Sequence, residues 1–431
     1  MTSEIDTTHE HTMVDEALRI AGELEAIQLE MNATTRNQGS EFLEAASLVD
    51  QWPTPNVDMT DLVDVRIASK TPVITPGLLE RRLPLSQNSA DTTRQGRIIA
   101  EQIIKGTDDR LLVIVGPCSL HDPEAALEYA SRVAGWRKEY GANLEVVMRA
   151  YTEKPRSTIG WKGMTYDPLL DNSSNINLGL TLTRMLARKI TDMGVPTAME
   201  RLNGLTPQYL NGLVAYDAIG ARNVADQNAR EYGSATSSII GIKNGTDGGV
   251  SDAADAIETV NAPHNYPGSD MDGNLSKVKT TGNDTAHLIL RGGKSGPNYS
   301  TEKVQEAKRA LTTDRIKNNK SPLLEAIVVD ASHGNSEKDY RNQIKVIESV
   351  AGQIALGELA LRGVMIESNL VEGAQKIGPL DTLEKGKSVT DSCVDVEETT
   401  VMLTLLSQAV ETRRKIIAEN TAKPNKQAVM A

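Results

Sequence analysis

The sequence predicts an α/β fold, namely a (β/α)8 TIM barrel with an N-terminal extension and a hairpin-like insertion before the sixth strand. Eight short apolar runs lie between residues 111 and 366, and segments with helical periodicity separate most of them. This alternation is typical of parallel strands joined by right-handed crossovers. Each run also ends at or just before a residue that can bind an anion or a metal. That position is expected where a barrel assembles its active site at the C-terminal ends of its strands.

The expected strands are short apolar runs, as strands buried on both faces of a parallel sheet usually are. They are Leu111–Val115, Leu144–Met148, Val195–Met199, Asp217–Gly220, Ser238–Ile242, Ala286–Leu290, Ala326–Val329 and Gly363–Ile366. The residues at or just past their ends are Cys118, Arg149, Glu200, Arg222, Lys243, Arg291, Asp330 with His333, and Glu367. A core strand has no use for charge at a fixed end, so these side chains are candidates for a functional site.

Apolar residues at three- and four-residue spacing predict helices. The first covers residues 13–31, with an apolar stripe of Val14, Leu18, Ala21, Leu24 and Ile27. Further helices are expected over residues 92–104, 124–138, 177–193, 206–214, 251–260, 301–311, 336–354 and 394–417. A strand is suggested near Val63–Ile67, and the polar run Asn265–Asp284 is expected to be a loop or hairpin. These elements divide the chain into an N-terminal extension, partly helical or disordered (1–60), a TIM-barrel catalytic domain (61–417) and a C-terminal tail (418–431).

The bulk properties favour a cytoplasmic protein with a small anionic ligand. The net charge of −12 argues against nucleic acid as a partner, because that role usually needs a basic surface. Two cysteines, Cys118 and Cys393, do not make the disulfide framework of a secreted protein. No apolar stretch approaches the roughly 20 residues of a membrane span, and the acidic N-terminus resembles neither a signal nor a transit peptide. We therefore expect no membrane association.

Basic residues follow several of the expected strands. Arg149, Lys154 and Arg156 lie within eight positions directly after the second strand, with Pro155 between the last two and Ser157 next. Arginine suits phosphate oxygens and lysine acts as a point charge or proton donor. An exposed basic loop is the simpler reading of this segment, although Pro155 stiffens it. Three further cations stand beside glycines, where a backbone can approach a ligand closely; they are Arg222, Lys243 and Arg291.

Four residues with metal-ligating side chains come from separate strand ends. Cys118, His333, Glu367 and Asp391 supply a sulfur, an imidazole nitrogen and two carboxylates. This mixed set suits a borderline divalent cation with an open coordination position. Each residue alone is more often structural, since most free cysteines are buried and inert. Their shared position predicts a metal site.

These motifs together resemble type I 3-deoxy-D-arabino-heptulosonate-7-phosphate (DAHP) synthases, over residues 60–415. The similar segments are GPCSLHD, MRAYTEKPRSTIGWKG, IKNGTDGG, LILRGGK, DASHGNSEKDYRNQ, VMIESNLVEG and SVTDSC. The resemblance implies condensation of phosphoenolpyruvate (PEP) with erythrose 4-phosphate on a TIM barrel that needs Mn²⁺, Fe²⁺ or Co²⁺, and a homo-dimer or homo-tetramer.

The resemblance also implies residue roles. Cys118, His333, Glu367 and Asp391 would hold the metal. Arg149, Lys154, Arg222, Lys243 and Arg291 would contact PEP, and Lys154, Pro155, Arg156 and Ser157 would hold erythrose 4-phosphate. Lys154 and His333 are the expected catalytic residues. Pro207, Gln208 and Ser237 would belong to a regulatory site for an aromatic amino acid.

The chain departs from the family pattern after Arg222. Asn223–Gln227 stands where the family usually has Thr-Thr-Glu-Ser-Gln, and the stretch ending at Ser237 is altered as well. The resemblance therefore implies weak or altered feedback control. Two alternatives stay open: a related synthase that uses another aldose phosphate, and a catalytically weak homologue with a regulatory role.

Overall fold

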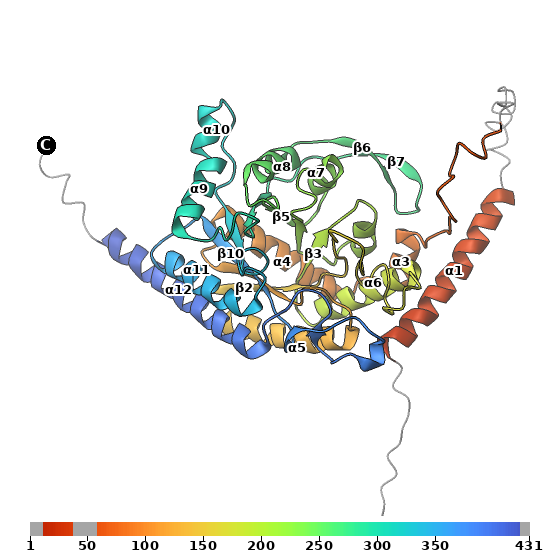
Figure 1. Cartoon of the computed structure of the whole chain (residues 1–431), viewed down its shortest axis with the longest axis horizontal. Coiled ribbons are helices and arrows are strands. Elements are labelled where there is room, and N and C mark those ends of the chain that lie inside the picture. The colour runs from red at the N-terminus through yellow and green to blue at the C-terminus, as the bar shows by residue number, and fades with distance from the viewer. Residues whose placement is uncertain (1–11, 38–57, 423–431) are drawn as a thin grey trace, which may run out of the picture.

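The computed structural model describes residues 12–37 and 58–422. Its centre is a closed barrel of eight parallel strands in the order β1-β10-β9-β8-β5-β4-β3-β2 (Figure 1). The strands are β1 Leu111–Gly116, β2 Leu144–Arg149, β3 Thr197–Arg201, β4 Tyr216–Ile219, β5 Ile239–Lys243, β8 His287–Leu290, β9 Ile327–Asp330 and β10 Leu361–Glu367. Each pairs in parallel with its neighbours, and β1 closes the barrel against β10. The predicted TIM barrel and its eight strands are confirmed.

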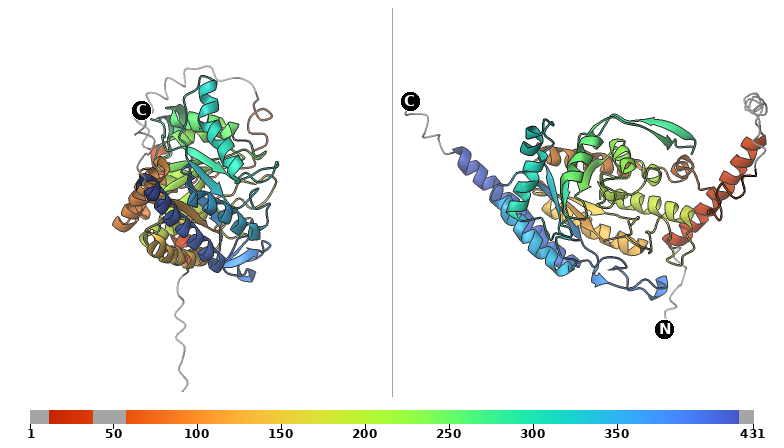
Figure 2. Two further views of the ribbon diagram at one scale, coloured as in Figure 1. Left: turned by 90° about the vertical axis from the view of Figure 1, so that its left-hand side faces the viewer. Right: turned by 45° about the horizontal axis from the view of Figure 1, so that its top comes forward.

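Helices surround this barrel and two of them extend well beyond it. They are α1 Met13–Asn37, α3 Pro76–Arg82, α4 Gln87–Lys105, α5 Pro123–Tyr140, α6 Ile176–Asp192, α7 Gln227–Ser234, α8 Ser251–Asn261, α9 Thr301–Leu311, α10 Thr313–Lys317, α11 Gln343–Ala355 and α12 Val396–Ala422. Figure 2 shows α1 (red) and α12 (blue) reaching past opposite sides of the barrel. No helix of the described ranges combines the length and the apolar character that crossing a bilayer requires.

The core has two layers because side chains alternate along each strand. Leu112 and Ile114 of β1 belong to a cluster inside the barrel, which Ile103 and Ile104 of α4 join. Val113 belongs to the larger cluster between the barrel and its helices. The strands are therefore buried on both faces, which explains why they are apolar throughout.

The run Asn265–Asp284, expected to be a loop or a hairpin, contains an antiparallel hairpin. The hairpin consists of β6 Asn265–Ser269 and β7 Leu275–Lys279, which pair across a turn. Figure 1 shows it arching over the end of the molecule near α7 and α8. A second two-stranded sheet, β11 Val371–Ala374 with β12 Lys387–Ser388, lies between β10 and α12 and was not predicted.

Three secondary-structure predictions are wrong. Residues 206–214 form only a short 3-10 helix, η1 Thr206–Leu210, because Gly212 takes a left-handed conformation (φ 77°) that ends any helix. Residues 336–342 precede α11 instead of belonging to it, since Glu337 and Lys338 also have positive φ. No strand forms over Val63–Ile67, which is exposed and pairs with no strand of the described chain.

The helix predicted at residues 13–31 exists as α1, but its buried face differs from the predicted stripe. Met13, Ala17, Ile20 and Leu24 are buried, whereas Leu18 and Ile27 are more than two-fifths exposed. The helix has apolar residues on more than one face, and the face that contacts α6 is the one that becomes buried.

Candidate functional site

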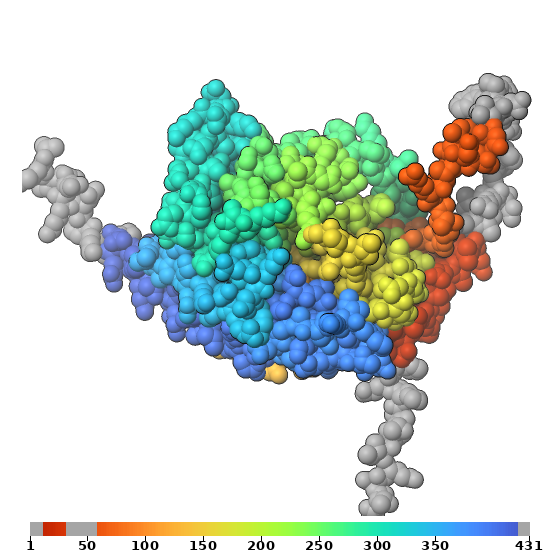
Figure 3. Space-filling model, viewed as in Figure 1, coloured from red at the N-terminus to blue at the C-terminus, as the bar shows by residue number. Residues whose placement is uncertain are grey.

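A cavity of about 210 Å³ opens at the C-terminal ends of the barrel strands. Most of the predicted site residues meet there although they come from six different strand ends. Its lining residues are Lys154, Pro155, Arg156, Ser157, Thr158, Glu200, Ala221, Arg222, Lys243, Thr246, Arg291, His333 and Asp391. In the space-filling view, the loop after β2 (yellow) lies beside the segment between β10 and α12 (blue) on this face (Figure 3). Five basic side chains thus converge on a small volume, which favours an anionic ligand.

Lys243 and Arg291 form the inner part of this basic group. The Nζ of Lys243 is buried and lies 3.3 Å from Asp330 Oδ2. Arg291 follows β8, and its backbone N–H donates to Asn244 Oδ1 at 2.8 Å. At the outer part, the exposed Arg222 donates from Nε to Ser157 Oγ at 2.7 Å. The basic side chains are therefore arranged from the barrel axis to the cavity mouth.

Lys154 connects the basic group with the cysteine of the predicted metal set. Its Nζ donates to the carbonyl oxygen and to Sγ of Cys118, both at 3.1 Å. Burial alone would lower the pKa of Lys154, but Cys118 and Glu367 outweigh it and raise the pKa to about 12. The ammonium therefore stays protonated. The neighbouring Arg156 and Ser157 are exposed at the cavity mouth.

Arg149 is not among the residues that line the cavity. Its buried guanidinium donates to Pro117 O at 3.1 Å and to Glu367 Oε1 at 2.8 Å, and it stacks on the Tyr151 ring at 3.7 Å. In this structure Arg149 therefore supports Glu367 and the loop that carries Cys118 from behind.

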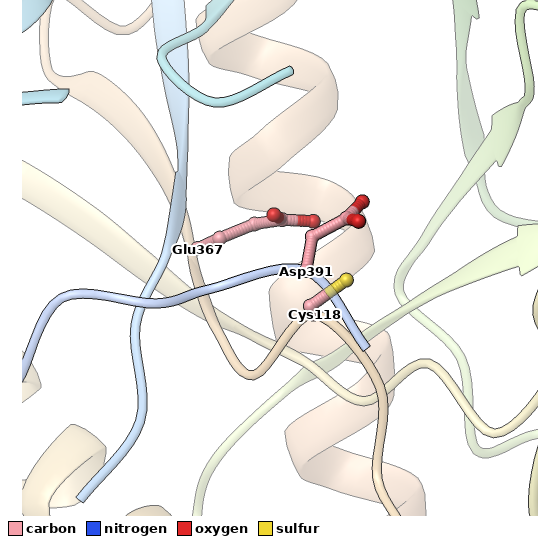
Figure 4. A group of neighbouring side chains, drawn as sticks. All are labelled: Cys118, Glu367 and Asp391. Carbon is pink, nitrogen blue, oxygen red and sulfur yellow. The ribbon is translucent and has the colours of Figure 1, made fainter. Parts of the chain in front are cut away.

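Cys118, Glu367 and Asp391 form a compact group of possible metal ligands. One ligand atom from each lies within 4.8 Å of the others. Figure 4 shows the three side chains beside one another, with Glu367 at the end of β10 and the other two on loops. Gly116 pairs with Glu367 across β1 and β10, which brings Cys118 near. Asp391 is held in place because Ser119 Oγ and the neighbouring Thr390 Oγ1 lie 2.7 Å apart.

His333 lies next to this group but is not part of the compact set of three. Its Nε2 is 3.7 Å from Glu367 Oε1. Its Nδ1 lies 3.0 Å from Asp330 Oδ2 and 2.6 Å from Ser332 Oγ. Partners of this kind on one ring nitrogen orient the other toward a metal. His333 also has a positive φ of 58°, a left-handed backbone conformation that is uncommon outside glycine.

The donor chemistry of these four residues fits a divalent transition metal. One sulfur, two carboxylates and an imidazole nitrogen match the ligands of borderline cations. Burial and the nearby Glu367 raise the pKa of the Cys118 thiol to about 11. A bound cation is what would favour the thiolate here, because metal binding removes the thiol proton.

Two residues at strand ends have surroundings that sequence reasoning did not foresee. Asp330 contacts both Lys243 and His333 and so joins the basic group to the metal-ligand group. Glu200 lines the cavity among the cations, and although burial opposes ionisation, Lys243 and Lys154 lower its pKa. The sequence did contain one signal for these roles, because Asp330 and Glu200 are both acidic residues at the end of an apolar strand.

A second cavity of about 430 Å³ lies beside the first and shares Glu200 with it. Pro207, Gln208 and Ser237, the three residues of the predicted regulatory site, all line it. The hairpin strands cover it, and Tyr232 packs edge-on against Tyr266 with ring centroids 5.0 Å apart. The lining also includes charged residues that were not predicted: Arg97, Glu153, and Arg201, which bonds Asp217 at 2.9 Å.

Comparisons with known proteins agree with this geometry. A model of the DAHP synthetase I family matches residues 84–404. The Phe-sensitive phospho-2-dehydro-3-deoxyheptonate aldolase of Escherichia coli K12 is 46% identical over 351 residues, which are 81% of this chain and 98% of that protein. The tyrosine-inhibited enzyme of Candida albicans is 45% identical over 365 residues, covering 83% and 96%. The structure of the aldolase of the same name from Francisella tularensis superposes with a TM-score of 0.77 at 44% identity, covering 80% of this chain and 99% of that one.

Proposed function

Because this chain belongs to the DAHP synthetase I family, we propose that it condenses PEP with D-erythrose 4-phosphate and water to DAHP and phosphate. This is the first step of the shikimate pathway of aromatic amino-acid biosynthesis. The observation that carries the proposal is that five cations line one cavity beside a Cys/Glu/Asp group. Two phosphorylated substrates need such a concentration of positive charge, and their union needs them held side by side.

The two substrates are assigned to different parts of the cavity. PEP binds to Lys243, Arg291 and Arg222, with Lys154 on its metal side. Arg149 supports this region through Glu367. Erythrose 4-phosphate binds nearer the mouth, where the exposed Arg156 and Ser157 hold its phosphate. The division follows from position: the buried Lys243 and Lys154 suit the smaller substrate, Arg222 reaches it from the outer side, and the mouth accommodates a sugar chain.

Cys118, His333, Glu367 and Asp391 would hold the divalent ion, Mn²⁺, Fe²⁺ or Co²⁺. When bound, this ion supplies Lewis-acid polarisation of the aldehyde oxygen. The protein's own residues do the rest of the positioning. C3 of PEP forms a bond to the aldehyde carbon with the electron pair of its C2–C3 double bond, and a water oxygen adds to C2. The bond between C2 and the phosphate-ester oxygen then breaks, so C2 becomes a carbonyl carbon and phosphate leaves. Of the two protons that the water gives up, one goes to the leaving phosphate and the other replaces the proton that Lys154 donates. Lys154 donates a proton to the former aldehyde oxygen, and Asp330 keeps His333 oriented.

A phosphate-release assay tests the proposal. The protein is incubated with PEP plus erythrose 4-phosphate, or PEP plus a five-carbon aldose phosphate, each with and without Mn²⁺. We expect phosphate release with PEP plus erythrose 4-phosphate but not with PEP plus the five-carbon sugar. Chelation of the metal should abolish this release, and added metal should restore it. Release only with the five-carbon sugar supports the related synthase, and no release with either supports the regulatory homologue. The His333→Ala variant should lose metal while it keeps its fold.

The second cavity supports a proposal about regulation. An aromatic amino acid would bind among Pro207, Gln208 and Ser237, as the names of the Phe-sensitive and tyrosine-inhibited relatives suggest for those proteins. The altered stretch Asn223–Ser237 supplies Tyr232 and residues 235–237 to the lining of this cavity, so we propose weak or altered inhibition. A cytoplasmic location and a homo-dimeric or homo-tetrameric state complete the proposal.

A further inference from the structure

We propose that three buried asparagines position the anion-binding and metal-binding halves of the site relative to each other. Asn244, Asn298 and Asn335, here called the asparagine cluster, follow β5, β8 and β9 respectively. None of them lines the catalytic cavity. The inference rests on the proposed function for the identity of the anion, PEP, but not for the metal half.

Asn244 holds the loop that carries Arg291. Its Oδ1 accepts from the backbone N–H of Arg291 at 2.8 Å, and its Nδ2 donates to Gly292 O at 3.0 Å. Its own backbone N–H donates to Ile289 O at 3.0 Å. The first residues after β8 are thus bound to the residue that directly follows Lys243.

Asn298 connects this loop to the next one. Its Oδ1 accepts from Gly292 N–H at 2.7 Å, and its Nδ2 donates to Asn244 Oδ1 at 3.1 Å. Its backbone N–H donates to Asn335 Oδ1 at 2.8 Å. In each of the three side chains, a backbone N–H identifies the oxygen, so none of the amides can be flipped without losing a bond.

Asn335 completes the chain of contacts at the metal half. Its Nδ2 donates to Leu290 O at 3.1 Å and to Asp330 O at 2.8 Å. Asp330 is the carboxylate that binds His333 Nδ1 and Lys243 Nζ. One amide group therefore joins the end of β8, just before Arg291, to the end of β9, just before His333.

The backbones between these amides are too close for side chains to intervene. A Cβ atom on Gly293 would lie 2.2 Å from Gly248 N, and one on Gly334 would lie 2.6 Å from Gly293 N. Three loops thus meet backbone to backbone, and the asparagine cluster supplies the polar contacts between them. A buried network of this kind is rigid only while all of its members are satisfied.

Two nearly isosteric substitutions separate the two halves. Asn298→Asp keeps the acceptor for Gly292 N–H and removes the donor to Asn244, on the Arg291 side. Asn335→Asp keeps the acceptor for Asn298 N–H and removes both donors, including the one to Asp330. The matched control is Asn143→Asp, since Asn143 is equally buried but donates to Ser407 and Glu411 away from the cavity.

Affinities are measured directly on the full chain: PEP by calorimetry with Mn²⁺ present, and Mn²⁺ by electron paramagnetic resonance of the free ion. We expect Asn298→Asp to raise the Kd of PEP about 10-fold or more while the Mn²⁺ Kd changes little. Asn335→Asp should raise the Mn²⁺ Kd by about 10-fold, the lower end of the effect of losing an outer partner of a metal ligand, because Asn335 reaches His333 only through Asp330. The control should lower Tm without changing either Kd.

The uncharged variants Asn298→Ala and Asn335→Ala distinguish positioning from the effect of a new charge, and they replace the Asp variants if those fail to fold. If the asparagines act by positioning, Asn298→Ala should again mainly raise the Kd of PEP, and Asn335→Ala should again raise the Kd of Mn²⁺. Unchanged Kd values in all variants, or effects with Asp that are absent with Ala, would overturn the inference. If the unsubstituted protein binds Mn²⁺ but not PEP, the proposed function fails, and the Mn²⁺ measurements still decide the role of Asn335.

Discussion

Asp330 is the residue on which the two halves of the catalytic cavity depend. Burial would raise its pKa, but His333 and Lys243 outweigh burial and hold the pKa well below its usual range. The carboxylate therefore stays ionised, keeps Lys243 in place and orients the imidazole of His333. Because the Asp330 carboxylate contacts both side chains, it fixes their positions and also balances their charge.

The neighbouring residues Lys154 and Arg156 should act on different substrates. Lys154 is buried against Cys118, whereas Arg156 is exposed at the mouth. Arg156→Ala should raise the KM for erythrose 4-phosphate by about 10-fold or more and leave that for PEP nearly unchanged, because a charged phosphate contact contributes about 1.5–3 kcal/mol. Lys154→Ala should mainly lower kcat. Steady-state kinetics on both substrates decide the matter, and equal effects of the two variants would contradict the division.

Glu153 makes the stability of the protein depend on pH. Burial raises the pKa of its carboxyl to about 7 in the folded state. A raised carboxyl pKa means that the folded state holds the proton more tightly, so stability is lost as pH rises from the unfolded pKa toward 7. Glu153→Gln removes this penalty and should stabilise the protein at pH 8 by on the order of 2 kcal/mol, with little effect at pH 4.

Tm measured at both pH values checks the Glu153 prediction, with the exposed Glu348→Gln as control. If Glu153→Gln gave the same change in Tm at both pH values, or matched the control, titration of Glu153 would not be the cause.

Among the elements, α1 shows how packing selects one face of a helix. Met13, Ala17, Ile20 and Leu24 are buried beside α6, and Arg82 binds Glu23 at its edge. The opposite face keeps apolar residues in solvent, including Leu29, which is 61% exposed. Amphipathic periodicity alone does not choose between two partly apolar faces.

Leu24 and Leu29 therefore form a matched pair on one helix. Leu24→Ala should destabilise the protein by about 2–5 kcal/mol, because it removes buried methyl groups and leaves a cavity. Leu29→Ala should change stability by less than about 0.5 kcal/mol. Denaturant unfolding of both variants tests this, and a similar cost for the two substitutions would mean that α1 is not docked as described.

At the scale of the whole molecule, two cavities lie side by side and share a lining residue. Glu200 lines both, and Thr152 and Glu153 of the second cavity directly precede Lys154 of the first. A ligand in the larger cavity would therefore lie close to the residues proposed to bind substrates. The barrel places the two cavities together because both are lined by residues at or just past the ends of β2 and β3.

Inhibition by aromatic amino acids should nevertheless be weak. The stretch Asn223–Ser237 departs from the family pattern, and Tyr232 and residues 235–237 of this stretch line the larger cavity. Titration of the active enzyme with Phe, Tyr and Trp at fixed substrate should show no half-inhibition at micromolar concentrations. Micromolar inhibition by any of the three would show that the altered stretch leaves the effector site intact.

The sequence by itself determined the barrel, its strand positions and the group of residues at the cavity. Apolar runs of strand length are local signals, and charged residues such as Lys243 and Glu367 at their ends stand out against an apolar background. The C-terminal ends of parallel strands meet at one face of a barrel. The positions of the eight runs in the sequence were therefore enough to predict that these residues lie together.

Only the tertiary structure decided what each of these side chains contacts. Arg149 and Lys243 look alike as strand-end cations, yet one is turned behind Glu367 and the other faces the cavity. The buried face of α1, the early end of η1 and the asparagine cluster were likewise not visible in the sequence. Each depends on residues far apart in the chain, and the energy that selects one contact over another arises only when those residues are packed together.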